Sequence, residues 1–79
     1  MKNSVGLFSS TVGDDGEHKF FTADICYDNK IVALISQDKG LGDLELEIYP
    51  NPDGGPWTFS MSEFIDAINI AKSKMLNIS

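Results

Sequence analysis

Three carboxylates occupy every second position of one short segment: Asp43, Glu45 and Glu47. Two acids about 5–10 Å apart can act as general acid and base, as in glycoside hydrolysis, when a cleft raises the pKa of one of them. Alternate residues of a strand lie about 7 Å apart, so the spacing satisfies the distance. Because the segment predicts an exposed strand and no cleft, we expect these acids to act as surface charges.

The other reactive side chains are few and far apart. Cys26 is the only cysteine and His18 the only histidine, so no internal disulfide can form, and we expect Cys26 to be a small apolar strand residue. The acidic turns around Asp14 and Asp53 lack the ligand spacing of a calcium loop. Gly40–Gly42 lacks the third glycine of a dinucleotide site. The sequence therefore predicts no enzyme, no metal site and no cofactor.

Charge and length narrow the class of partner. The 79 residues predict a single domain over 1–79, with 12 acidic residues, 6 lysines and no arginine, for a net charge of −6. A negative field disfavours nucleic acid and attracts a basic protein surface. We find no leader-like or membrane-spanning apolar stretch, and one unpaired cysteine suits a reducing compartment. We therefore expect a cytoplasmic protein that binds neither nucleic acid nor membrane.

The elements that position these residues follow from periodicity and turn signals. Strands are expected over residues 5–10, 18–26, 31–36 and 43–49, with a fifth, short strand over 57–59. Asp28 and Asn29 predict a tight turn between the second and third strands. The fold class is therefore α+β: an antiparallel β-meander of four to five strands with one C-terminal α-helix packed on one face.

The helix carries clear start signals. Ser60 and Glu63 fit a capping box, and Phe59 and Phe64 fit a hydrophobic staple, so the helix is expected from Met61 to about residue 76. One apolar stripe is predicted: Met61, Phe64, Ile65, Ile68, Ala71 and Met75. We expect this stripe to cover the aliphatic face of the fourth strand: Leu44, Leu46 and Ile48. The opposite face of the sheet would then be open.

The acids of the fourth strand have aromatic neighbours. Tyr49 extends the row of Asp43, Glu45 and Glu47, and Trp57 follows after a Pro/Gly loop. Acids beside aromatic residues are common in protein interfaces, so these five residues form the predicted partner-binding site. The alternative is that the acids are a solvated strand face and that Trp57 belongs to the core.

The C-terminal half resembles small bacterial immunity proteins of polymorphic toxin systems, including contact-dependent and Rhs-type systems. The resemblance covers about the last 35 residues: strand Leu44–Tyr49, the Pro/Gly loop, Trp57–Phe64, and a helix with Ala67, Ala71–Lys72 and Leu76. It implies a cytoplasmic protein that binds one cognate toxin and blocks its active site. Many such toxins are nucleases with cationic surfaces, which an acidic row could occupy.

Two functions from different classes remain open. The first is an inhibitory protein-binding module that resembles an immunity protein, with a basic partner such as a nuclease toxin. The second is a small structural or assembly subunit that forms a homodimer through an edge strand or an open sheet face, for which an exposed Phe20 would be a sign. A small enzyme or ligand carrier would need a cavity that we do not expect.

Overall fold

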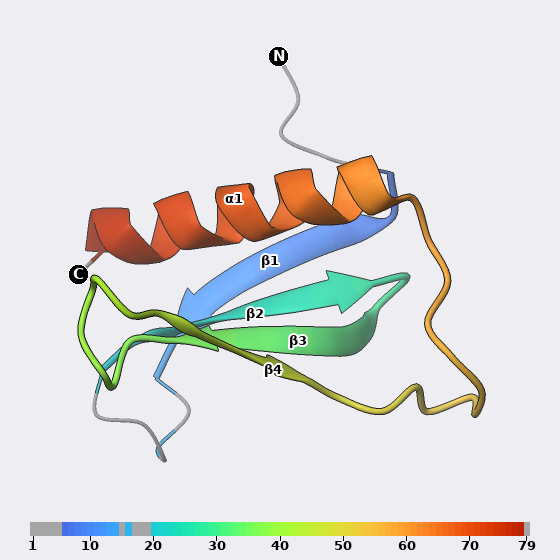
Figure 1. Cartoon of the computed structure of the whole chain (residues 1–79), viewed down its shortest axis with the longest axis horizontal. Coiled ribbons are helices and arrows are strands. Elements are labelled where there is room, and N and C mark those ends of the chain that lie inside the picture. Colours follow the sequence, from blue (N-terminus) through green and yellow to red (C-terminus); the bar gives the residue numbers. More distant parts are fainter. Residues whose placement is uncertain (1–5, 15, 17–19, 79) are drawn as a thin grey trace.

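The chain forms a four-stranded antiparallel meander followed by one long helix (Figure 1). The computed structural model describes residues 6–14, 16 and 20–78. Its elements are β1 (Phe8–Gly13), β2 (Thr22–Tyr27), β3 (Lys30–Ser36), β4 (Glu45–Ile48) and α1 (Met61–Ile78). Each strand pairs with its neighbours in sequence, in the order β1-β2-β3-β4. The predicted α+β meander with one C-terminal helix is confirmed.

Some predicted strand limits differ from those in the structure. β1 begins at Phe8, three residues later than expected, and it continues through residues that were predicted to turn. β2 begins at Thr22, and positions 18 and 19 of the predicted strand lie outside the described residues. Trp57–Phe59 is not a strand, so the described part of the sheet has four strands.

The β2–β3 turn is confirmed and has a clear physical basis. Asp28 and Asn29 both have positive φ, 52° and 66°, as a type I′ turn requires. Asp and Asn tolerate this left-handed region better than most residues. Because the twist of this turn matches that of paired strands, it fixes the register of the central hairpin.

A bulge redirects one side chain of β3 into the core. Ile25 pairs with Ala33, whereas Cys26 pairs with Ile31, so Val32 is an extra residue opposite β2. Its side chain is fully buried, and its carbonyl accepts a hydrogen bond from the Tyr49 amide at 2.8 Å. The bulge therefore buries one more aliphatic side chain and ties β3 to the residue after β4.

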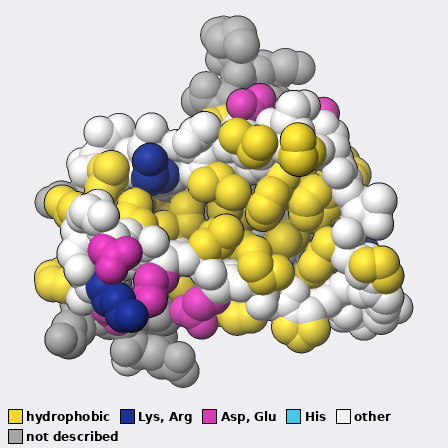
Figure 2. Space-filling model, viewed as in Figure 1, with side chains coloured by type: hydrophobic (Ala, Val, Ile, Leu, Met, Phe, Trp, Pro, Cys, Tyr) yellow, Lys and Arg dark blue, Asp and Glu magenta, His cyan; other side chains and the backbone are white. Residues whose placement is uncertain are grey.

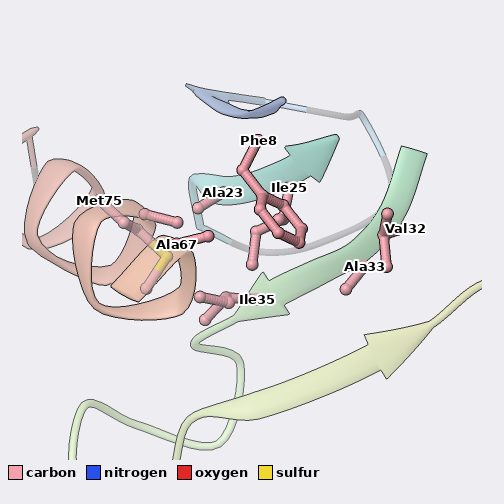
Figure 3. Close-up of a cluster of buried hydrophobic side chains, with 9 residues drawn as sticks. Phe8, Ala23, Ile25, Val32, Ala33, Ile35, Ala67 and Met75 are labelled. Carbon is pink, nitrogen blue, oxygen red and sulfur yellow. The ribbon is translucent and has the colours of Figure 1, made fainter. Parts of the chain in front are cut away.

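The core lies between α1 and the sheet (Figure 3). Side chains of Ile25, Ile35, Ala67 and Met75 point toward one another there. The helix contributes small residues, Ala67 and Ala71, which allow it to approach the strands closely. Aromatic rings continue the core at the start of α1, where Phe8 lies 4.9 Å from Phe59 between ring centroids.

The start of α1 shows the Ser60 half of the predicted capping box and the predicted staple. The Ser60 hydroxyl accepts a hydrogen bond from the Glu63 amide at 3.3 Å. The rings of Phe59 and Phe64, the expected staple pair, lie 5.0 Å apart. The Glu63 carboxylate lies beside Gly6. These contacts fix the helix start and hold it next to the residues that precede β1.

The helix covers only part of the sheet, because its packing is against β1 and β2. The Lys74 ammonium donates a hydrogen bond to the carbonyl of Ser10 in β1, at 3.1 Å. One flank of α1 is therefore held at the β1 side of the sheet, while β4 lies at the opposite edge. Among the described residues, no helix is both long enough and apolar enough to cross a bilayer.

Candidate protein-binding surface

The predicted acids lie on and beside β4, on the side of the sheet away from the core. Glu45 pairs with Ser36 and Glu47 with Leu34, whereas Leu46 pairs with the core residue Ile35. Because strand residues alternate between faces, the two glutamates point away from the core side. Both are exposed, as is Asp43 in the preceding loop.

The acidic row is not a set of free charges. The Glu45 carboxylate forms a 3.1 Å ion pair with the Lys39 ammonium, and Glu47 also interacts with another group. An exposed ion pair of this kind holds its partners weakly, but it reduces the local negative field. The role of Asp43, Glu45 and Glu47 in binding remains a prediction, and its electrostatic basis is weaker than the sequence suggests.

Tyr49 and Trp57, the aromatic members of the predicted site, are joined to each other. The Trp57 indole Nε1–H donates to the Tyr49 carbonyl at 2.8 Å, and both residues are half-buried. Trp57 packs against the core cluster, so the structure does not group it with the acids on the far side of β4. This placement fits the alternative in which Trp57 is part of the core.

The prediction that α1 covers the aliphatic face of β4 is wrong for Leu46 and Ile48. Their cross-strand partners, Ile35 and Ala33, are buried, yet Leu46 is 42% exposed and Ile48 56%. Leu44 alone packs partly against the core. The physical reason is the position of the helix: α1 packs on β1 and β2, and β4 is the edge strand on the opposite side of the sheet. The helix, together with the half-buried Trp57 and Phe59, covers the sheet only as far as β3.

The helix also leaves apolar side chains uncovered. Met61 is 77% exposed and Ile65 49%, although both were predicted to lie in the buried stripe. The stripe that the helix does bury consists of Ala67, Ala71 and Met75, with Phe64 half-buried. Successive residues rotate by about 100° around a helix, which places Met61 and Ile65 on one flank of this stripe.

This exposed flank faces the β4 side of the sheet. Lys74 and Glu63 lie on the other flank, and they contact Ser10 and Gly6, at and just before β1. The flank with Ile65, Ile68 and Leu76 therefore points toward β3 and β4.

The uncovered parts of α1 and β4 form one surface, which we call the open face: Leu46, Ile48, Met61, Ile65, Ile68 and Leu76. Figure 2 shows hydrophobic side chains gathered over the area between α1 and β4, with charged side chains over the β3–β4 loop at one end. From the exposed fractions, the open face presents roughly 500 Å² of apolar surface, which is near the upper end for a monomer and typical of an interaction site.

The face of the sheet on the far side from α1 is not the open one. Thr22, Leu34 and Ser36 are buried, although their pairing places them on the side away from the core. The prediction of an open far face therefore fails for the central strands. The open apolar surface lies instead beside the helix, on the helix's own side of the sheet.

Several described lysines are engaged within the molecule, which leaves the exterior acidic. Lys30 forms a 2.9 Å ion pair with Asp53, and this hydrogen bond and charge raise the pKa of Lys30 above its ordinary value. Lys39 pairs with Glu45, and Lys74 is bonded to a backbone carbonyl. Since the chain carries a net charge of −6, a partner approaching the open face meets a negative field.

The described residues offer little for catalysis. No three histidine, cysteine or acidic side chains lie close enough among them to hold a metal ion. Burial, with a smaller contribution from Asp24, raises the pKa of the Cys26 thiol, which lowers its reactivity. A shallow hollow of about 360 Å³ on the outer side of α1 is lined by Asn69, Ile70, Ser73, Lys74 and Asn77, a set without a carboxylate or imidazole.

Comparison with known proteins yields no relative: no family model, no curated protein and no solved structure matches this chain. The function is therefore inferred from the geometry and charge of the surface. The residues that sequence reasoning missed are the exposed apolar ones, Leu46, Ile48, Met61 and Ile65. The signal that could have identified them is the number of predicted elements, because a single helix cannot cover one whole side of a four-stranded sheet.

Proposed function

We propose that this protein is a binding module for another protein, and that the open face is the surface that the partner covers. The observation that carries the proposal is the set of exposed aliphatic side chains on β4 and on the flank of α1, above all Ile48 and Met61, together with the hydrophobic area between these elements (Figure 2). Large exposed apolar patches on small monomers mark interaction sites. A standard interface covers about 800 Å² of each partner, and somewhat more than half of that area is apolar, so roughly 500 Å² of apolar surface matches one side of such an interface.

The partner's surface is expected to be basic around an apolar centre. The net charge of −6 speeds encounter with a cationic protein through long-range attraction. Asp43, in the loop before β4, and Asp66, on the side of α1 away from the sheet, are exposed acids that contribute to this field. Charge would raise the association rate, and the aliphatic centre would slow dissociation.

The resemblance to immunity proteins adds an inhibitory role to this proposal. In that role the module binds a toxin in the cytoplasm and blocks its active site, and a nuclease toxin would supply the basic surface. The antiparallel sheet and the acidic exterior are consistent with this, and the resemblance is its main support. The alternative is a homodimer, which the self-complementary apolar chemistry of the open face favours.

The test uses a toxin domain encoded next to this gene as the binding partner. Ile48→Asp is expected to weaken the complex by tenfold or more, because it places a charge in the apolar centre of the interface. Thr11→Asp, on the exposed far side of β1, is the matched control and is expected to leave affinity unchanged. Equal affinity of both variants would contradict the proposal.

Light scattering at micromolar and millimolar concentration separates the homodimer from the proposal. A monomer at both concentrations agrees with a module that awaits another protein. A dimer that Ile48→Asp dissociates would show that the open face serves self-association, and the proposal would then be wrong.

A further inference from the structure

We infer that the open face receives one amphipathic α-helix of the partner, lying between the exposed flank of α1 and β4, with lysines and arginines on its outer side. This inference rests on the proposed function, because it names the element by which the partner binds. Three properties of the surface support it: its width, its two-sided shape and its charge.

The width of the uncovered strip is that of one helix. α1 packs on β1 and β2, and a neighbouring helix would pack 8–10 Å from it. With strands about 4.8 Å apart, this displacement places a second axis between α1 and β4, above the residues of β3 that are already buried in the core. The side chains left for a second helix to cover are those of β4 and of the exposed flank of α1.

The length of the strip corresponds to about four helical turns. It runs along α1 from Met61 to Leu76, sixteen residues, whose fifteen steps of about 1.5 Å span about 22 Å. A helix of about fifteen residues would therefore cover the open face from end to end. Apolar residues at every third and fourth position would face Leu46 and Ile48 on one side and Ile65 and Ile68 on the other.

The shape of the surface favours a helix over an added strand. The open face is formed by two walls, β4 and the flank of α1, and a strand added at the edge of β4 would leave Met61 and Ile65 exposed. β4 is also only four residues long and carries Glu45 and Glu47. Short, charged edge strands resist strand addition. A helix lying between the two walls covers both.

Charge favours a different protein over a second copy as the donor of this helix. Each copy carries a net charge of −6, so two copies repel each other at long range. A partner helix with a basic outer side would instead be attracted by this net charge, to which the exposed Asp43 in the loop before β4 contributes. Lys72, on the exposed flank of α1, would pair with an acid on the partner helix.

The experiment supplies such a helix within the same chain. A fifteen-residue segment with leucines at helical spacing, and lysines and arginines elsewhere, is fused after Ser79 through a short Gly/Ser linker. Tethering gives a high effective concentration, so even weak docking becomes visible. The matched control has the same residues in an order without an apolar stripe, and a second control replaces the basic residues by glutamate.

The basic amphipathic fusion is expected to show added helical circular dichroism, a higher urea midpoint, a shift of Trp57 emission, and hydrogen-exchange protection at Leu46 and Ile48. The scrambled control should show none of these, and the glutamate version should show a smaller midpoint shift that salt increases. Ile48→Asp in the basic fusion should remove most of the midpoint gain, whereas Thr11→Asp should retain it.

Two outcomes would overturn the inference. The first is an unfolded tethered helix, or equal effects of the amphipathic and scrambled segments. The second is a partner complex in which the open face is covered by an extended strand, which would leave the proposed function intact. A dimer of the untethered protein that Ile48→Asp dissociates would refute both the inference and the proposed function.

Discussion

The contrast between Ile48 and Ile35 tests whether the open face is open in solution. Both are isoleucines on the core side of neighbouring strands, but Ile35 is 3% exposed and Ile48 56%. Truncating a fully buried isoleucine to alanine costs about 2–5 kcal/mol, including the cavity that remains. Less than half of the surface of Ile48 is buried, so its truncation to alanine would leave no enclosed cavity. We expect about 3 kcal/mol for Ile35→Ala and about 1 kcal/mol for Ile48→Ala.

The free energy of unfolding is measured in urea by the fluorescence of Trp57, the only tryptophan. Trp57 is half-buried and bonded to the Tyr49 carbonyl, so its emission will report unfolding. Each variant is compared with the unmodified protein at two protein concentrations. The slope m should be the same for all, because the same surface is exposed on unfolding.

Equal costs for the two substitutions would refute the reasoning. Such a result would mean that Ile48 is buried in the solution molecule, and the concentration series would identify how. A cost for Ile48→Ala that rises with protein concentration would indicate burial by self-association. A cost that is large at every concentration would indicate that α1 or another segment covers β4.

Two further predictions concern the helix start and the cysteine. Ser60→Ala should lower the free energy of unfolding by about 1 kcal/mol, because it removes the helix cap, whereas Ser73→Ala on the exposed helix surface should change it little. Cys26 should react with iodoacetamide more slowly in the folded protein than in urea, since burial and then Asp24 raise the thiol pKa. Because the pKa of the Cys26 thiol is raised in the folded protein, the protonated thiol contributes to the free energy of unfolding. This contribution is full at pH values below the ordinary thiol pKa and is lost as the pH rises through the raised pKa. Cys26→Ala should therefore reduce the loss of stability at alkaline pH.

Local signals predicted the elements well. The Asp28–Asn29 turn requires residues that tolerate positive φ, and the helix start requires a hydroxyl at Ser60 and two rings that pack across it. Both signals act over a few residues, so the sequence contains all the information needed. The strand limits near residues 13 and 22 were harder, because Gly13 can end a strand or continue one.

Which strands of the sheet α1 covers could not be predicted in the same way. Alternation of Leu44, Leu46 and Ile48 with acids indicates that β4 has an apolar side, but not whether anything packs on that side. The answer depends on where α1 crosses the sheet, which follows from long-range packing of Ala67, Ala71 and Met75 against the strands. The predicted binding site and the proposed open face therefore share β4 but use opposite sides of it.

The chain topology has a consequence for the order in which the fold assembles. Every strand pairs with its neighbour in sequence, so the meander forms by closing short loops, which is fast. Docking of α1 joins residues as far apart as Ser10 and Lys74, 64 positions along the chain. We therefore expect helix docking to be the late, long-range step of folding, and until it is complete the nascent sheet would expose its whole aliphatic side.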